Sequence, residues 1–281
     1  MTSARRLRTY ASAIFFILFA LPAAAGTLSV AVAANMQYVF DDIKTEFKKE
    51  TGHEVLASFS SSGKFAIQIM NGAPYDVFLS ADMEYPEHLY AKGFTTNTPK
   101  VYAYGSLVLW SMKNLDLSQW QTLLTDNRVK KIALANPKTA PYGREAIRVL
   151  TYYKLNDKVQ SKLVFGESIS QTNQYIQSGV VELGFTAKSI VTSPEMDGQG
   201  KWIDLPLDSY QAIAQGAVIL KHAKEKNDVS AQQFFDFLFS TKVRRILERI
   251  GPTMASAPLR RVIQSVCLVA FLVSFFYICW P

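Results

Sequence analysis

The sequence predicts an α/β protein with two lobes, each a mostly parallel sheet flanked by helices, joined by two crossover strands. Short apolar runs alternate with amphipathic runs over residues 27–92, and the alternation restarts over 131–187. Such alternation is typical of parallel sheets with helices on their faces. Two further apolar stretches, 101–111 and 212–220, lie on either side of the second series. We expect these two stretches to be the strands that cross between the lobes.

The first series begins with an apolar strand over 27–33. Asn35 is then a good N-cap for an amphipathic helix that Gly52 ends. The rest of this half is expected to contain strand 54–59, helix 64–70, strand 75–80 and helix 86–92. The second half is expected to contain strand 131–135, helix 144–153, strand 163–165, helix 171–177 and strand 183–186. Helices over 229–239 and 241–250 complete the body.

The N-terminal segment has the pattern of a secretory signal peptide. Three arginines precede the apolar run 13–20, and small residues follow it, which fits cleavage after Ala25. We therefore expect the mature chain to work outside the cytoplasm. The expected division is a signal peptide at 1–25, lobe 1 at 26–104 and 213–258, lobe 2 at 105–212, and a hydrophobic tail at 259–281.

Charge and cysteine usage exclude several classes of function. The full chain has a formal net charge of +7, and removal of Arg5, Arg6 and Arg8 leaves +4. That charge is too small to indicate a nucleic-acid partner, and no run of Lys or Arg is longer than two. The only cysteines are Cys267 and Cys279. The folded body is therefore expected to have neither a disulfide framework nor a thiolate metal site.

Four turns that join a strand to a helix point to an anion site. They lie at 33–35, 60–63, 140–143 and 168–170, two in each half of the chain. Helix starts present free N–H groups and the positive end of the helix dipole, and ligands of open α/β sheets lie beyond the carboxyl ends of the strands. Apart from Glu167, these turns carry hydroxyl, amide and backbone groups with no charge. Such a set of donors suits a small, fully ionised anion, selected by its size.

Other residues have simpler interpretations. Asn35 alone can be a plain N-cap, and Tyr142 alone can be a core residue. Asp76 and Asp82 are expected to be turn or cap residues. His53, His88 and His222 are too scattered in the sequence to indicate a metal or catalytic site.

A hydrolase is the enzyme alternative, with Ser60, Ser61 or Ser62 as the nucleophile. This role needs a base within reach and usually a Gly-x-Ser-x-Gly elbow. The serine run lacks the leading Gly, and no His lies in a turn at a strand end. We therefore expect no catalytic residues and no enzyme.

Several motifs occur together in a known order. They are Ala33-Ala34-Asn35, Thr51-Gly52-His53, Ser61-Ser62-Gly63, the block from Gln68 to Asp82 that contains Asn71-Gly72-Ala73-Pro74-Tyr75-Asp76, Leu107-Val108-Leu109-Trp110-Ser111, and Ala140-Pro141-Tyr142-Gly143. Over residues 27 to 251 the chain resembles the periplasmic molybdate-binding proteins of ABC transporters (ModA-like). The resemblance implies a type II periplasmic-binding-protein fold that holds an oxyanion in the cleft between its lobes.

The resemblance also implies which residues hold the ligand. Asn35, the Ala34 backbone and Ser62 would bind it from the first lobe, and Tyr142 and the backbone N–H of Ile169 from the second. No cofactor and no direct protein ligand to a metal are implied, because molybdenum would be held through its oxygens. The chain departs from the family in two places: Ala187 stands where some members have a ligand-binding Tyr, and Ala34 where many have Ser or Thr.

The function implied is a monomeric periplasmic receptor that delivers molybdate or tungstate to an inner-membrane permease. Two alternatives stay open: a receptor for another tetrahedral oxyanion such as sulfate, and a membrane-tethered oxyanion sensor. The tether would be the apolar run 262–281, which has the length of a membrane span. Arg260 and Arg261 precede it on the side that would be periplasmic, against the positive-inside tendency. An altered end of the sequence is the competing interpretation, because the composition switches abruptly.

Overall fold

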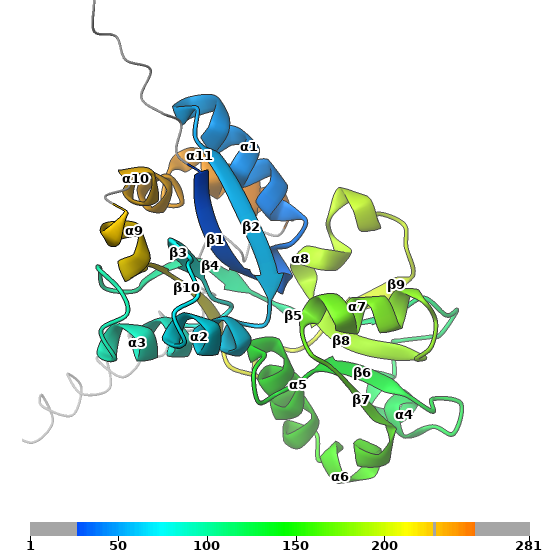
Figure 1. Cartoon of the computed structure of the whole chain (residues 1–281). Helices are drawn as coiled ribbons and strands as arrows, with labels where there is room; N and C mark the ends of the chain where they lie inside the picture. Colours follow the sequence, from blue (N-terminus) through cyan, green and yellow to red (C-terminus); the bar gives the residue numbers. More distant parts are fainter. Residues whose placement is uncertain (1–26, 227–228, 251–281) are drawn as a thin grey trace, which may run out of the picture.

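A computed structural model describes residues 27–226 and 229–250, which form two five-stranded sheets with helices on their faces (Figure 1). The predicted α/β fold with two lobes is confirmed. Both sheets are mixed, because in each sheet four strands run in one direction and one strand, β10 in the first and β5 in the second, runs in the opposite direction. The segments predicted as signal peptide (1–25) and hydrophobic tail (259–281) lie outside the described residues.

The first sheet has the order β2-β1-β3-β10-β4. Its strands are β1 (Thr27–Ala33), β2 (Glu54–Ser60), β3 (Val77–Leu79), β4 (Lys100–Gly105) and β10 (Ile213–Ile219). Strand β1 is parallel to β2 and β3, whereas β10 is antiparallel to β3 and β4. The carboxyl ends of β1, β2 and β3 therefore meet at one edge, where the chain enters the predicted turns.

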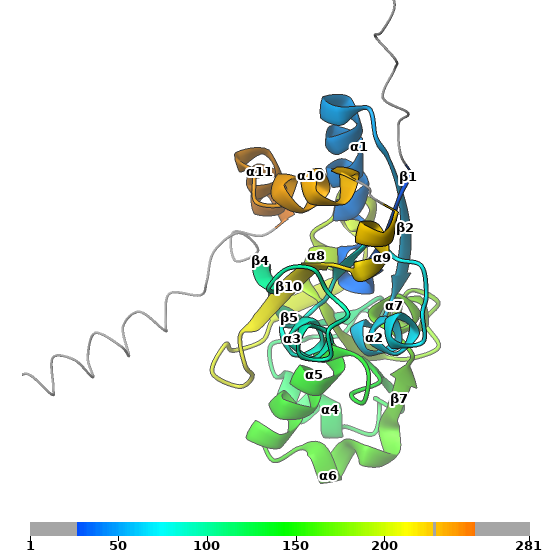
Figure 2. The same ribbon diagram turned by 60° about the vertical axis from the view of Figure 1, so that its left-hand side comes forward.

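Alternate residues of these strands bury their side chains on opposite faces. Val30 and Val32 face the core beneath α1 (Val39–Thr51), α10 (Val229–Phe237) and α11 (Thr241–Ile250), whereas Ala31 faces α2 (Ser62–Met70) and α3 (Glu84–Ala91). Figure 2 shows the two groups of helices on either side of this sheet. Both faces are covered, which explains why β1 is apolar from Val30 to Ala33.

The second sheet has the order β7-β6-β8-β5-β9. Its strands are β5 (Leu107–Ser111), β6 (Ile132–Ala135), β7 (Leu163–Gly166), β8 (Leu183–Ala187) and β9 (Lys201–Asp204). The main helices of this lobe are α5 (Pro141–Tyr152) and α7 (Ile169–Gln177). The shorter elements between β5 and β9 are α4 (Trp120–Thr125), α6 (Asn156–Val159), η2 (Gln160–Lys162), α8 (Lys188–Val191) and η3 (Pro194–Met196). Two more short elements follow strands of the first sheet: η1 (Ala34–Met36) after β1 and α9 (Lys221–Glu225) after β10.

Two segments connect the sheets. Only Ser106 separates β4 of the first sheet from β5 of the second, and the return runs from β9 through residues 205–212 to β10. The backbone N–H of Leu107 donates to the Tyr210 hydroxyl at 3.1 Å, so the two crossings are tied to each other. The exact lobe boundaries given above stay a prediction.

Most of the predicted elements are present, with some shifts. The helices at 62, 141 and 169 begin two or three residues before their predicted starts, so the turn residues themselves form the first helical turns. The apolar run 101–111 is two strands that belong to different sheets. The prediction that Asn35 caps a helix is wrong: Asn35 lies inside η1, and α1 begins four residues later without a side-chain cap. Strand β9 and the short helices were not predicted.

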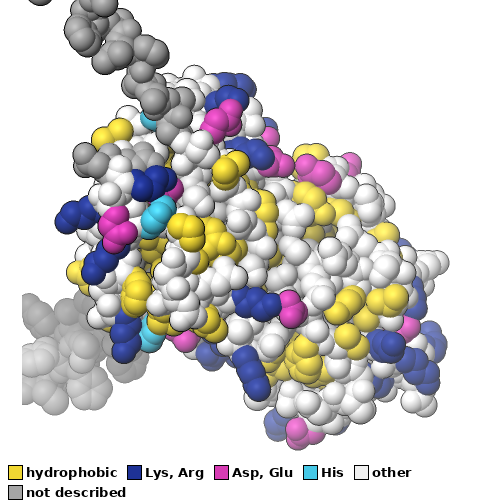
Figure 3. All heavy atoms as spheres, in the orientation of Figure 1, with side chains coloured by type: hydrophobic (Ala, Val, Ile, Leu, Met, Phe, Trp, Pro, Cys, Tyr) yellow, Lys and Arg dark blue, Asp and Glu magenta, His cyan; other side chains and the backbone are white. Residues whose placement is uncertain are grey.

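The face of the molecule drawn in Figure 3 gives little indication of a charged partner. Lys and Arg side chains are scattered among Asp and Glu on the face in Figure 3, and they do not gather in one patch. Within the described ranges, no helix is long and apolar enough to span a bilayer. The same residues hold no cluster of three or more His, Cys, Asp or Glu that fits a metal ion.

Candidate anion site

The four predicted turns meet around one small pocket between the lobes. The pocket brings together all five residues named from the sequence: Ala34, Asn35, Ser62, Tyr142 and Ile169. Its other lining residues are Ala33, Ser60, Ser61, Ala81, Ala140 and Pro141. The volume open to the centres of water-sized molecules is about 10 Å³, which is near the minimum that holds one water. The pocket in this form therefore has room for about one water molecule.

Three helices of nine residues or more begin at this pocket. Helix α2 begins at Ser62, α5 at Pro141 and α7 at Ile169. Their first N–H groups have no partners within the helix, and their dipoles place partial positive charge at these ends. The backbone N–H of Gly63 is already used, because it donates to the Thr139 carbonyl of the other lobe at 2.9 Å. The remaining first-turn N–H groups make the pocket a site for negative charge.

The two serines at the start of α2 differ in their hydrogen bonds. Ser62 is completely buried, and its Oγ accepts the N–H of Ala81 at 2.9 Å. Ser61 occupies the N-cap position but makes no capping hydrogen bond, and its buried Oγ has no partner. A serine at an N-cap usually bonds the helix backbone, so the free Ser61 hydroxyl is unusual. Both hydroxyl protons are available to a ligand.

Tyr142 presents a neutral phenol to the pocket. Its side chain is buried, and the hydroxyl makes no hydrogen bond. Burial raises the pKa of the phenol far above its ordinary value, and the neighbouring Tyr210 acts in the same direction, whereas the nearby Asn35 amide lowers it. The group therefore stays protonated and can donate. The Tyr142 hydroxyl packs directly on Gly105, where a Cβ atom would lie 2.1 Å from it.

Asn35 is held from both lobes. Its Nδ2 donates to Oε1 of Gln215 at 2.8 Å, and the same oxygen accepts the Tyr102 hydroxyl at 3.1 Å. From the second lobe, the Ser189 hydroxyl donates to the Asn35 carbonyl at 2.8 Å. One atom departs from the all-donor set that the sequence predicts: the side-chain Oδ1 of Asn35 is a buried acceptor without a partner.

The pocket itself is uncharged. None of the described residues that line it carries a charge. Glu167, the charged residue directly before the predicted turn at 168–170, is mostly exposed and pairs with Lys64 across the lobes. An anion in the pocket would be held by hydrogen bonds and helix dipoles, with no neutralising side chain in contact.

The two carboxylates predicted to be turn or cap residues do more than that. Asp76 is fully buried, where it accepts the Ser29 N–H at 2.8 Å and pairs with His222 at 2.8 Å and Lys226 at 3.0 Å. This pairing gives His222 a structural role far along the chain from its partner.

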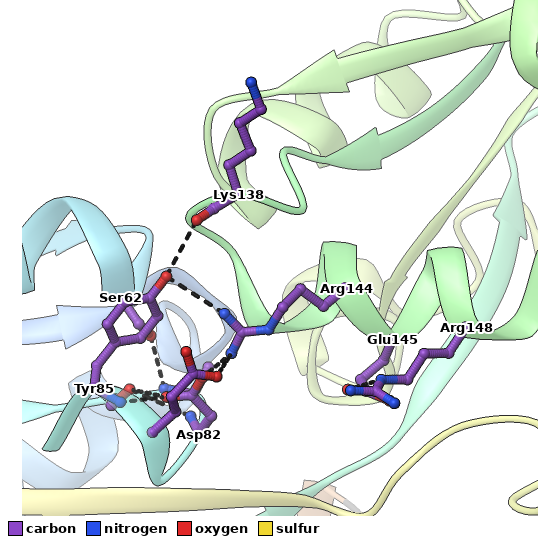
Figure 4. Close-up of polar contacts among 10 residues, drawn as sticks. Ser62, Asp82, Tyr85, Lys138, Arg144, Glu145 and Arg148 are labelled. Atoms are coloured by element: carbon purple, nitrogen blue, oxygen red, sulfur yellow. Dashed lines mark hydrogen bonds and ion pairs between the residues drawn. The ribbon is translucent and has the colours of Figure 1, made fainter. Parts of the chain in front are cut away.

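Asp82 forms an ion pair with Arg144 of the opposite lobe (Figure 4). Burial raises the pKa of the Asp82 carboxyl, and the Arg144 guanidinium opposes this shift. Both aspartates therefore tie together elements that are far apart in the sequence.

Some site residues were missed by the sequence prediction. Ser61 was predicted to lie in the 60–63 turn of the anion site and was weighed as a nucleophile, but it was not named among the ligand-binding residues, although its position beside Ser62 could have placed it there. Gln215 and Gly105 carry no local signal, because their roles depend on contacts with residues far away in the sequence.

Comparison with known proteins agrees with the resemblance to periplasmic molybdate-binding proteins that the sequence motifs indicate. The sequence profile described as "Bacterial extracellular solute-binding protein" matches residues 28–251. The molybdate-binding protein ModA of Azotobacter vinelandii is 42% identical over 236 residues, which cover 83% of this chain and 92% of that protein. ModA of Rhodobacter capsulatus is 38% identical over 247 residues, 87% of this chain and 96% of that protein.

A solved structure agrees with these sequence matches. The periplasmic molybdate-binding protein of Azotobacter vinelandii superimposes with a TM-score of 0.74 and 36% identity, and the match covers 80% of this chain and 97% of that one. The predicted resemblance is confirmed, and the prediction of a solute-binding protein rather than an enzyme is confirmed with it. The chain belongs to the bacterial extracellular solute-binding protein family.

Proposed function

We propose that this chain is a periplasmic receptor that captures molybdate between its lobes and delivers it to an ABC transporter permease. The observation that carries the proposal is the uncharged interlobe pocket in which Ser61 Oγ and Tyr142 Oη are buried without hydrogen-bond partners. Buried polar atoms are almost always paired. Two such orphans in one pocket therefore point to a ligand that accepts hydrogen bonds. Relatives described as molybdate-binding support the choice of oxyanion.

The ligand contacts follow from the pocket. Ser61, Ser62 and Tyr142 each donate a hydroxyl proton to the oxyanion. The backbone N–H groups at Ala34, Asn35 and Ile169 donate as well, from helix starts whose dipoles favour negative charge. Apart from the side-chain oxygen of Asn35, these groups are donors, which matches an anion that carries no proton.

Selectivity among tetrahedral dianions then depends on size, because sulfate, molybdate and tungstate present the same four oxygens. Phosphate differs, since near neutral pH it carries a proton that needs an acceptor. The unpartnered Asn35 Oδ1 is the one acceptor side-chain atom found unpaired in the pocket. Its orientation decides whether hydrogen phosphate is rejected.

The transport role rests on lobe closure. A ligand that contacts both lobes stabilises the closed form over the open one, and the closed form is the one a permease would distinguish. We further propose that the chain reaches the periplasm through the signal peptide at 1–25 and acts there as a monomer, with tungstate as a second ligand.

Thermal unfolding with a panel of oxyanions tests the proposal. Molybdate at 100 times its dissociation constant should stabilise the fold by about 2.7 kcal/mol. For a chain of this length, that corresponds to a rise of roughly 5–10 °C in the unfolding midpoint. Tungstate should give a similar shift, whereas sulfate, phosphate and nitrate at equal concentration should give little. No shift with molybdate, or an equal shift with sulfate, would contradict the proposal.

A further inference from the structure

A charged cluster joins the two lobes beside the pocket. Arg144 of α5, in the second lobe, pairs through Nη2 with Asp82 and, at 3.2 Å, with Glu84 of the first lobe. Its Nη1 donates to the Tyr85 hydroxyl at 3.4 Å, and the guanidinium carbon lies 5.4 Å from the centre of the Tyr85 ring. Figure 4 shows Arg144 extending from its helix to Asp82 and Tyr85.

The first lobe holds its half of this cluster in place without Arg144. Oδ1 of Asp82 accepts the Ser80 hydroxyl at 2.9 Å and the Tyr85 N–H at 3.3 Å. These bonds orient the carboxylate from within the first lobe, and its other oxygen, Oδ2, accepts the hydrogen bond from Arg144. A planar guanidinium suits this arrangement, because it can bond a carboxylate and stack on an aromatic ring at the same time.

Two neutral hydrogen bonds across the lobes accompany the ion pair. The Tyr85 hydroxyl donates to the Lys138 carbonyl at 3.3 Å, and the Gly63 N–H donates to the Thr139 carbonyl at 2.9 Å. The approach depends on Gly63, since a Cβ atom there would lie 2.5 Å from the Tyr85 hydroxyl and 2.9 Å from the Thr139 carbonyl oxygen. The lobes are thus in direct backbone contact at this point.

The cluster adjoins the pocket but does not line it. Arg144 is two residues after Tyr142 on α5, and Asp82 follows Ala81, whose N–H is bonded to Ser62. Neither Arg144, Asp82 nor Tyr85 is among the residues that line the pocket. These three side chains therefore make no direct contact with a ligand in the pocket.

We propose that Arg144, Asp82 and Tyr85 form an interlobe latch that holds the receptor closed and so sets the rate at which the ligand leaves. The proposal deepens the function proposed above and rests on it. The latch bonds exist only when the lobes meet, so they slow opening and leave the encounter of the ligand with the open form unchanged. Arg144 and Asp82 are positioning residues in this account.

Arg148 provides a matched control. It lies one turn further along the same helix and pairs with Glu145 of its own lobe at 3.2 Å. Arg144→Met and Arg148→Met each remove one arginine from α5, but only Arg144→Met removes a contact between lobes (Figure 4). Arg144→Lys keeps the positive charge but loses the planar guanidinium group that bonds Asp82 and stacks on Tyr85.

Stopped-flow binding of molybdate to the full chain separates the rates. Arg144→Met should raise the dissociation rate about tenfold and leave the association rate within about twofold of the original. Arg144→Lys should give a smaller increase, and Arg148→Met should leave both rates unchanged. Asp82→Asn combined with Arg144→Met should be no faster than the faster single variant, because both remove the same contact. A dissociation rate unchanged in Arg144→Met, or equally raised in Arg148→Met, overturns the latch.

A second measurement needs no ligand and separates this proposal from the function. Nitroxide labels at Lys92→Cys in the first lobe and Lys158→Cys in the second, both exposed positions, report the distance between lobes by pulsed electron resonance, with Cys267 and Cys279 replaced by Ser. If the original protein binds none of the oxyanions, the proposed function fails. The latch then still predicts longer distances in Arg144→Met than in Arg148→Met. Identical distance distributions in the two variants would overturn it.

Discussion

The side-chain amide of Asn35 donates to the side-chain oxygen of Gln215 over 2.8 Å, although the two residues are 180 positions apart. This bond joins the pocket to β10, the strand by which the chain returns to the first lobe. On the other side of the pocket, Tyr142 packs on Gly105 at the end of β4. Residues predicted to bind the ligand therefore contact β4 and β10, the two strands of the first sheet that are joined to the connections between the lobes.

Replacement of Gln215 should weaken binding without removing any ligand contact. Gln215→Leu leaves the Asn35 amide unpaired in a buried site, so we expect about tenfold weaker molybdate binding and a loss of about 1–3 kcal/mol in unfolding free energy. Tyr102→Phe is the control, because it removes the other donor to the same oxygen and does not touch Asn35. Calorimetric titration and urea unfolding measure both effects. Equal losses of affinity in the two variants would argue against the role of Gln215 in orienting Asn35.

A methyl group at Gly105 should displace the binding tyrosine. Gly105→Ala places a Cβ atom 2.1 Å from the Tyr142 hydroxyl and 2.9 Å from Cζ, so the ring must move. Such overpacking typically costs about 1–3 kcal/mol of stability, and we expect affinity to fall more than tenfold. In a Tyr142→Phe background the same change should do less harm, since the closest contact is gone. An affinity that does not change in Gly105→Ala would show that the Tyr142 position is unimportant.

Ser61 should show a trade of stability against function. Ser61→Ala removes a buried hydroxyl without a partner, so the ligand-free protein should gain up to about 1 kcal/mol in unfolding free energy while molybdate binding weakens. Ser168→Ala is the comparison, because the Ser168 Oγ accepts the Gln171 N–H at the start of α7. That variant should lose about 1 kcal/mol instead. If Ser61→Ala also destabilises, its hydroxyl has a structural partner and the assignment fails.

Alkaline pH should unfold the protein through its buried tyrosines. Burial raises the pKa values of Tyr142 and Tyr102, so in the folded state they keep protons that the unfolded chain releases near pH 10. The stability they contribute is complete below about pH 10 and is lost as the pH rises above it.

Tyr142→Phe should reduce the slope of the unfolding free energy against pH by up to about 1.4 kcal/mol per pH unit, which is the slope that one proton contributes. Tyr152→Phe changes an exposed residue of the same helix and should keep the original slope. Urea unfolding between pH 8 and 11 measures the slopes, and equal slopes in all three proteins would refute the buried neutral phenol.

The sequence was informative where function depends on local chain geometry. The serine tract at the start of α2 and Ala140-Pro141-Tyr142-Gly143 at the start of α5 are contiguous, so their place at helix starts followed from strand and helix periodicity. The rule that parallel strands end at one edge predicted that these turns meet at one site, whereas the choice of Ser62 and Tyr142 within them came from the resemblance to the molybdate-binding proteins.

Other features depend on the tertiary structure and could not be predicted. Asp82 was expected to be a turn residue because its partner, Arg144, is 62 positions away and on the other lobe. Asn35 looked like an N-cap because its side chain fits that role locally, whereas the structure binds it to Gln215. Strand β9 is short and only partly buried, so it gives no strong apolar pattern.

Calorimetric titration of the purified protein with molybdate, tungstate, sulfate and phosphate tests the central claim most directly, repeated on Ser62→Ala and Tyr142→Phe. We predict tight binding of molybdate and tungstate, little or no binding of sulfate and phosphate, and a loss of about tenfold or more in affinity in each variant. Absence of heat with every oxyanion, from a protein shown to be folded, would contradict the account. Molybdate binding that neither substitution weakens would place the ligand elsewhere.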